Sequence, residues 1–155
     1  MKRSVLFVCL GNICRSPLAE AAFRREAERL GLDVEIDSAG TGDWHIGYPP
    51  DSRAAAVALR NGIDISHLKA RQVTPDDFRR FDHIVALDAN NLRDLERLRP
   101  ADSKARLSLL LDHVEGREGE AVADPYYGED SHFDEAWGDV SAGAEALARK
   151  IAEAG

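Results

Sequence analysis

The chain has 155 residues and a formal net charge of −8, with 44% hydrophobic and 31% charged residues. Its length predicts one domain, spanning residues 1–155, with a sizeable core. The acidic balance, without a basic patch or a long apolar segment, argues against a nucleic-acid partner, a signal peptide and a membrane span. Only two cysteines are present, which favours a reducing, cytoplasmic location.

The first predicted strand, together with the loop and helix that follow it, is the most informative stretch. Residues 4–9 are mostly apolar and predict a central strand that is covered on both faces. Gly11 and Asn12 tolerate positive φ, so the loop after the strand can curl back on itself. Ser16 as a cap and Pro17 in the first turn predict the start of a helix. The loop amides and the helix N-terminus then converge on a site suited to an anion.

Predicted strands and helices alternate along the rest of the chain. We expect helices at about 17–30, 52–61, 74–80, 90–98 and 132–153, and further strands at about 34–38, 83–87 and 105–109. Gly31 is the expected end of the first helix, and the strand at 34–38 is expected nearer an edge. The order predicts an α/β fold, a doubly wound, four-stranded parallel sheet with helices on both faces and a phosphate-binding loop after the first strand.

Cys9 opens this loop, and Arg15 and Ser16 close it. A lone cysteine at a strand end is more often a small core residue than a nucleophile. Loop amides, a guanidinium and a hydroxyl all favour the thiolate form, however, and the planar fork of Arg15 suits two phosphate oxygens. The loop lacks the lysine of a Walker motif and has no evident metal ligand, so we expect no metal or cofactor and a covalent route through a phosphocysteine.

The sequence resembles the low-molecular-weight protein tyrosine phosphatases nearly from end to end. Residues 9–17 resemble the signature loop of that family, and residues 124–128 resemble its second motif. Further family segments match at residues 38–41, 50–54 and 70–73. Two separate motifs in the right order are far more specific than a cysteine and an arginine alone.

The resemblance implies a role for particular residues. Cys9 is the expected nucleophile, Arg15 the clamp for the phosphoryl group, and Asp124 the general acid and then the general base. Without the family, Asp124 reads as one more acidic turn residue. The residues expected to bind phosphate and support the thiolate are Leu10, Gly11, Asn12, Ile13, Cys14 and Ser16. Those expected to hold the loop in shape with Asn12 are Ser38 and His67, and those expected to form the substrate cleft are Trp44, Tyr126 and Tyr127.

Other members of this fold act on different oxyanions, so the loop must be read closely. Related arginine phosphatases carry Thr where Ile13 stands, and related arsenate reductases carry Ser there and need distal cysteines that this chain lacks. The apolar Ile13 suits a flat aromatic ring, so the expected partner is a tyrosine-phosphorylated protein or an aryl phosphate. A protein-arginine phosphatase and a catalytically silent phosphate-binding module stay open as alternatives. We expect a monomer or weak self-association.

Cys14 has two readings. It lies close enough in sequence to act as a resolving thiol when Cys9 is oxidised to a sulfenic acid, which predicts a reversible Cys9–Cys14 disulfide that switches activity off. Alternatively, it packs beneath the loop.

Overall fold

The computed structural model describes residues 3–154, with a parallel sheet at its centre. Its four strands stand in the order β2-β1-β3-β4. Their bounds are β1 Arg3–Cys9, β2 Val34–Gly40, β3 His83–Ala86 and β4 Arg106–Leu109. All three pairings are parallel, with β1 in the interior and β2 at an edge. The predicted α/β sheet is confirmed.

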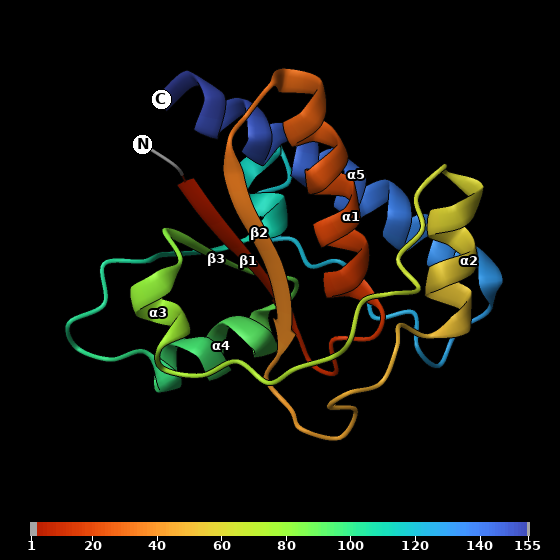
Figure 1. Ribbon diagram of the computed structural model, residues 1–155, viewed down its shortest axis with the longest axis horizontal. Helices are drawn as coiled ribbons and strands as arrows, with labels where there is room; N and C mark the ends of the chain where they lie inside the picture. Colours follow the sequence, from red (N-terminus) through yellow and green to blue (C-terminus); the bar gives the residue numbers. More distant parts are fainter. Residues whose placement is uncertain (1–2, 155) are drawn as a thin grey trace.

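Helices cover both faces of the sheet (Figure 1). They are α1 Arg15–Leu30, α2 Ser52–Arg60, α3 Asp77–Arg80, α4 Ala89–Leu98 and α5 Asp130–Ala154, with a 3₁₀ turn, η1, at Leu110–His113. The side chains of β1 alternate between two cores, because successive residues of a strand point to opposite faces. Val5 and Phe7 pack with residues of α1 and α5, while Leu6 and Val8 pack with residues of α3 and α4. Burial on both faces is why β1 reads as a continuous apolar run.

Helix α1 begins at Arg15, two residues earlier than predicted, and Ser16 is not its cap. Cys14 holds the cap position and makes no side-chain cap bond. Ser16 lies in the first turn instead, because its hydroxyl is used in the loop. Pro17 follows in the same turn, where its missing N–H costs nothing. The helix ends at Gly31, which has a left-handed φ of 66°. Its backbone amide donates hydrogen bonds to two carbonyls of the last turn, which confirms the expected C-cap.

Helix α5 runs from Asp130 to Ala154, slightly beyond the expected range. Its apolar stripe is buried, namely Phe133, Ala136, Trp137, Val140, Ala144, Leu147, Ala148 and Ile151. Gly143 permits the close approach of η1, since a Cβ there would lie 2.4 Å from Leu110 Cγ. Within residues 3–154 no helix, α5 included, has the length and apolarity to cross a membrane.

The carboxyl ends of β1 and β2 meet at one edge of the sheet. The amide of Thr41, just after β2, donates to the carbonyl of Cys9 at 2.9 Å. Gly40 lies directly beside the loop after β1, because a Cβ at this position would lie 2.7 Å from the carbonyl oxygen of Leu10. A side chain at residue 40 would therefore displace the loop that starts at Cys9.

Candidate active site

The loop between β1 and α1 turns its polar groups toward the sulfur of Cys9. Cys9 is 3% exposed, and its Sγ accepts a hydrogen bond from the Asn12 amide at 3.3 Å. Asn12 adopts a left-handed φ of 58°, which lets the chain curl around the sulfur. The Ser16 hydroxyl lies 3.1 Å from the same Sγ atom. The sulfur thus has an amide and a hydroxyl as its hydrogen-bonding neighbours.

The side chain of Asn12 determines how the Ser16 hydroxyl is used. Asn12 Nδ2 donates to Ser16 Oγ at 2.8 Å and to Ser38 Oγ at 3.0 Å. Because Ser16 Oγ accepts from Asn12, its own proton is free to be donated. Cys9 Sγ at 3.1 Å is a nearer acceptor for that proton than the Ala39 carbonyl at 3.4 Å. The network therefore directs a hydroxyl proton at the sulfur.

Arg15 closes the loop and is almost completely buried, at 3% exposure. Its Nη1 donates to Asp88 Oδ2 at 2.8 Å and to the Val122 carbonyl at 2.9 Å. Its Nη2 lies 3.6 Å from Asp124 Oδ2. A buried guanidinium needs such partners, since an unpaired charge in the interior is costly. These contacts fix the fork with one nitrogen engaged by Asp88 and the other facing Asp124.

Asp124 lies on an exposed turn that is held by a distant arginine. Its side chain is 43% exposed, and its Oδ1 accepts from the Tyr126 amide at 3.1 Å. Arg53, on α2, donates to the carbonyls of Tyr126 at 2.9 Å and Gly128 at 3.1 Å. Arg53 Nε donates to Asp51 Oδ1 at 3.1 Å, so Asp51 orients the Arg53 side chain. Burial raises the pKa of Asp51, but the Arg53 hydrogen bonds outweigh it and the net shift is downward, so the pair stays charged.

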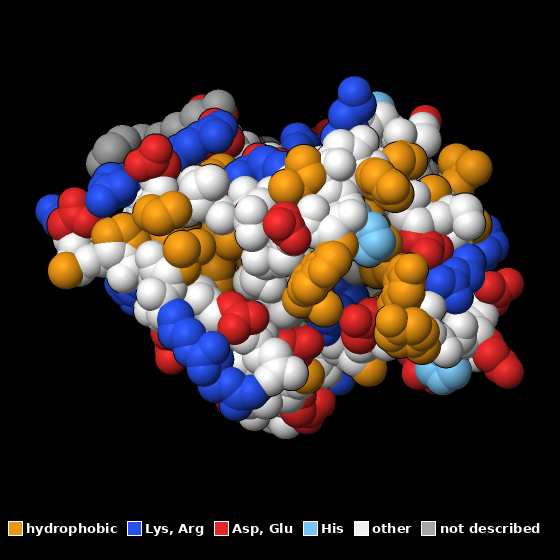
Figure 2. Space-filling view, turned by 90° about the horizontal axis from the view of Figure 1, so that it is seen from below, with side chains coloured by type: hydrophobic (Ala, Val, Ile, Leu, Met, Phe, Trp, Pro, Cys, Tyr) orange, Lys and Arg blue, Asp and Glu red, His pale blue; other side chains and the backbone are white. Residues whose placement is uncertain are grey.

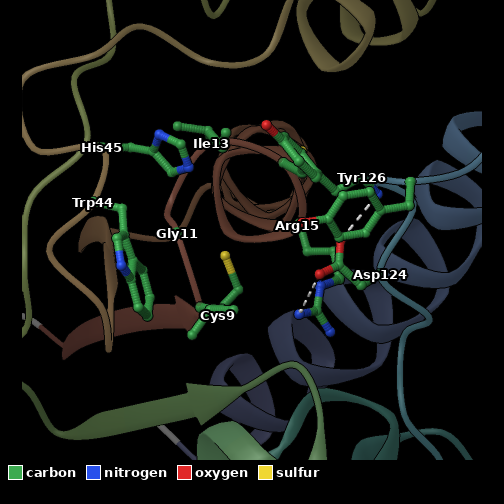
Figure 3. A pocket seen from close by; sticks show the side chains of 11 residues that line it. Cys9, Gly11, Ile13, Arg15, Trp44, His45, Asp124 and Tyr126 are labelled. Carbon is green, nitrogen blue, oxygen red and sulfur yellow. Dashed lines mark hydrogen bonds and ion pairs between the residues drawn. The ribbon is translucent and has the colours of Figure 1, made fainter.

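These elements enclose a cavity of about 430 Å³. Its lining residues are Cys9, Leu10, Gly11, Ile13, Cys14, Arg15, Trp44, His45, Asp124, Tyr126 and Tyr127. Trp44 and His45 lie on one side of the Cys9 sulfur, with Asp124 and Tyr126 on the other (Figure 3). Figure 2 shows this face of the molecule, where hydrophobic side chains gather around the hollow. The cavity thus has a thiol at its floor, a guanidinium and a carboxylate on one wall, and aromatic rings at its mouth.

Sequence and structure comparisons agree with this geometry. The family described as low molecular weight phosphotyrosine protein phosphatase matches residues 4–155. The chain belongs to this family. A phosphatase of that description from Schizosaccharomyces pombe is 48% identical over 132 residues, covering 83% of this chain and 84% of the relative. YfkJ of Bacillus subtilis, a low molecular weight protein-tyrosine-phosphatase, is 43% identical over 150 residues, covering 96% and 95%.

Solved structures of the family superpose closely on this chain. The crystal structure of YfkJ matches with a TM-score of 0.92 at 42% identity, covering 99% of this chain and 97% of that one. A Drosophila arginine phosphatase matches with a TM-score of 0.89 at 30% identity, covering 95% and 96%. The fold of the phosphatase family is therefore shared with a member named for a different phosphoamino acid.

Most residues singled out from the sequence meet at this site, but His67 does not. Asn12, Ser16 and Ser38 form one network beneath the Cys9 sulfur. His67 is exposed and takes no part in it. Ser38 Oγ donates instead to Glu20 Oε1 at 2.7 Å, and Glu20 is 3% exposed. A carboxylate on α1, not a histidine, therefore accepts from Ser38 here, and Arg24 Nη2 donates to the other oxygen of Glu20 at 2.9 Å.

Four residues of the site were missed in the sequence: Glu20, His45, Arg53 and Asp88. Asp88 follows β3, and the rule that ligands bind at the carboxyl ends of parallel strands points to it. Glu20 lies four residues after Ser16, hence on the same helix face, which is a usable pattern. His45 packs against Gly11, where a Cβ would lie 3.0 Å from its Cδ2. Neither His45 nor Arg53 had a local signature, because both act through contacts with distant segments.

Cys14, at the end of the loop, is 4% exposed and lines the catalytic cavity. Burial raises its pKa strongly, and the charges of Asp51 and Cys9 raise it further. Cys14 therefore stays a neutral thiol at physiological pH. Within residues 3–154 no group of three or more His, Cys, Asp or Glu side chains is arranged to hold a metal ion.

Proposed function

We propose that this phosphatase hydrolyses phosphotyrosine in proteins, with Cys9 as the nucleophile and a phosphocysteine as the intermediate. The observation that supports it best is the floor of the cavity. There the Asn12 amide donates a hydrogen bond to the Cys9 sulfur and the Ser16 hydroxyl lies within hydrogen-bond distance of it, with the Arg15 guanidinium on the adjacent wall. A thiolate is a far better nucleophile than a thiol, so groups that favour it lower the barrier to attack.

In the first step, Cys9 Sγ bonds to phosphorus as the bond from phosphorus to the phenolic oxygen breaks. Arg15 Nη1 is engaged by Asp88 and Val122, so Nε and Nη2 are the donors for two phosphoryl oxygens. Asp124, as the carboxylic acid, gives its proton to the departing phenolate oxygen. Because Asp124 Oδ2 lies 3.6 Å from Arg15 Nη2, the acid lies beside the phosphoryl group that Arg15 holds.

In the second step, a water molecule releases the phosphate. The Asp124 carboxylate takes a proton from the water, whose oxygen bonds to phosphorus as the phosphorus–sulfur bond breaks. The electron pair of that bond returns to Cys9 Sγ. The Ser16 hydroxyl and the Asn12 amide stabilise the departing thiolate, just as they favour it before attack.

The walls of the cavity favour an aromatic phosphomonoester. Ile13 and Leu10 are apolar, and Trp44 and Tyr126 offer ring faces and edges on opposite sides of the sulfur. A phosphoserine would leave these surfaces uncovered. Phosphoarginine is the second candidate, because its guanidinium suits the Asp124 carboxylate, which lines the cavity, and because the Drosophila relative is named an arginine phosphatase.

The proposal is tested with phosphotyrosine and phosphoarginine peptides of one sequence, assayed with and without a metal chelator. We expect higher kcat/KM for phosphotyrosine and about 10⁴-fold or greater loss in Cys9→Ser. Rapid acid quench of the parent enzyme with ³²P-labelled substrate is expected to trap label on the peptide containing Cys9. Full activity in Cys9→Ser contradicts the covalent route, whereas faster turnover of phosphoarginine supports the second candidate. Tight phosphate binding without hydrolysis identifies a silent binding module.

A further inference from the structure

A second cavity lies at the opposite end of β1 from Cys9. It has a volume of about 330 Å³. Its lining residues are Arg3, His83, Arg106, Ser108, His113, Leu147, Lys150, Ile151 and Ala154. They come from the amino ends of β1, β3 and β4, from η1 and from the last turns of α5. In Figure 1 this end of the molecule carries the N and C labels, far from the loops of the active site.

The register of the sheet brings the basic residues together. His83 stands opposite Val5 on β1 and opposite Arg106 on β4, so these three side chains share one face of the sheet. Arg3 lies two residues before Val5, and Ser108 lies two residues after Arg106, so both project from that same face. This is the face that α5 covers, and Lys150 is added from α5. The cluster is therefore fixed by strand pairing rather than by flexible loops.

The polar groups that line this cavity are arranged as donors. Lys150 Nζ lies 3.3 Å from His113 Nδ1, and an ammonium can only donate, so Nδ1 is the acceptor. The proton of neutral His113 is then on Nε2, which lies 2.9 Å from Ser108 Oγ and donates to it. The Ser108 hydroxyl therefore keeps its own proton for another acceptor. Together with two guanidinium groups and an ammonium, it gives the cavity a surplus of donors.

Carboxylates do not balance this charge. Other arginines of the molecule are paired with carboxylates, Arg60 with Asp134, Arg117 with Asp139 and Arg149 with Glu145. In the part of the chain from residue 3 to 154, by contrast, no ion pair involves Arg3, Arg106 or Lys150. A cluster of unpaired cations is unexpected in a chain whose net charge is −8, because carboxylates are abundant.

Two carboxylates lie beside the cavity, and both are held by backbone amides rather than by its cations. Asp82 accepts from the Ser4 amide at 3.0 Å, and Asp112 accepts from the Leu109 amide at 3.0 Å. The pKa values of the two histidines reflect the positive charge around them. Burial lowers the pKa of His83, and the charge of Arg106 lowers it further. Burial and then the charge of Lys150 lower the pKa of His113 to about 4, although the charge of Asp112 acts in the opposite direction. At neutral pH both rings are uncharged, and the three cations face the cavity.

The remaining wall is apolar. Leu147 and Ile151 are buried residues of α5 that also line the cavity. A ligand that fits this site needs an oxyanion for the cations and for Ser108, and a short apolar body for the helix. We propose that this cavity binds small organic anions, with a carboxylate or phosphate head held by Arg3, Arg106, Lys150 and Ser108 and the body packed on α5. Such a site is separate from the catalytic cavity.

The proposal is tested by titrating the protein with benzoate, phenylphosphonate and benzamide while recording the NMR signals of the His83 and His113 rings. These rings report on the second cavity alone, so phosphonate bound near Cys9 does not confuse the result. We expect saturable shifts with both anions, with Kd of about 1 mM, and none with benzamide, which has the same shape without the charge. A bound anion also raises the pKa of His113. Equal effects of benzamide and benzoate, or unmoved ring signals with both anions, overturn the proposal.

Two charge-removing variants identify the head-group contacts. Arg106→Gln is expected to weaken benzoate binding about fivefold to tenfold, because it removes a charge-assisted contact on an exposed residue that the fold does not need. Arg149→Gln is the matched control, one residue from Lys150 on α5 but paired with Glu145 outside the cavity. It is expected to leave the benzoate Kd unchanged. If both variants weaken binding equally, the anions respond to general surface charge, and the proposal fails.

Discussion

The two segments that meet at the catalytic cavity are held in opposite ways. In the loop of residues 9–16, Cys9 and Arg15 are each 3% exposed, and the backbone is fixed by bonds within the loop and to β2. In the turn of residues 124–128, the Asp124 side chain is 43% exposed and Tyr127 is 96% exposed. Nearly all of the polar groups around the Cys9 sulfur are buried, whereas the proposed acid lies at the surface.

In the proposed mechanism, this difference separates capture of the phosphoryl group by the loop from proton transfer by the turn. The buried hydrogen bonds of the loop would keep its rearrangement on binding small. The turn depends on two long-range contacts, Arg53 to its carbonyls and Arg15 to the Val122 carbonyl just before it. Changes in the loop should therefore impair every substrate, and changes in the turn should impair chiefly substrates that need a proton on the leaving group.

The largest effect is expected for Arg15→Lys, which changes the loop. A lysine keeps the charge but cannot contact Asp88, the Val122 carbonyl and two phosphoryl oxygens at once. We expect kcat/KM to fall about 10³-fold for all aryl phosphates, whatever their leaving group. Steady-state kinetics over a series of substituted phenyl phosphates measures this. A loss confined to poor leaving groups contradicts the assignment of Arg15 to capture.

Asp124→Ala is expected to lower kcat about 10²-fold for phenyl phosphate, because the departing phenolate then leaves without a proton. The loss should shrink steadily as the leaving group becomes more acidic. The same substituted series provides the measurement, and the slope of log kcat against leaving-group pKa should steepen relative to the parent. Inhibition by inorganic phosphate is the control for an intact loop. An unchanged slope means that Asp124 is not the acid.

The contrast between the two segments also explains what the sequence could predict. The strand, the loop and its anion site follow from local features: an apolar run, Gly11 and Asn12 for the turn, and Pro17 for the helix start. The same local view misplaced the cap at Ser16. It assigned the Ser16 hydroxyl both to the helix cap and to the thiolate, and in the structure the hydroxyl lies 3.1 Å from the Cys9 sulfur while Cys14 holds the cap position.

Long-range support was harder to predict. The spacing of Glu20 from Ser16 places both on one face of α1, but it does not predict the partner of Glu20, which is Ser38 on β2. Arg53 lies in the segment 50–54 that resembles the family, but its role was not predicted, since its partners are backbone carbonyls more than seventy positions away, a contact with no signature in composition. Asp124 itself was identified through family resemblance rather than through any physical pattern. Packing between distant segments creates these roles.

Arg53→Met tests whether the turn depends on its distant anchor. Losing the bonds to the Tyr126 and Gly128 carbonyls should displace Asp124 and lower kcat about tenfold for poor leaving groups, with little effect on good ones. Phosphate inhibition should stay unchanged, since the loop is untouched. Arg60→Met, on the same helix but paired with Asp134, is the matched control and should behave like the parent. If both variants lose activity equally for every substrate, Arg53 serves only the stability of α2.

The smallest effect on basal turnover is expected for Cys14→Ser, because Cys14 is a buried, neutral thiol and adds no charge to the loop. Its effect should appear under oxidation. After mild peroxide, a Cys9 sulfenic acid condenses with the Cys14 thiol, forming a disulfide and releasing water, so reductant should restore the parent but not Cys14→Ser. Since attack requires the Cys14 thiolate and burial raises its pKa, the disulfide should form faster as pH rises. Mass spectrometry that finds sulfinic Cys9 in the parent and no linked peptide would show that Cys14 is only a packing residue.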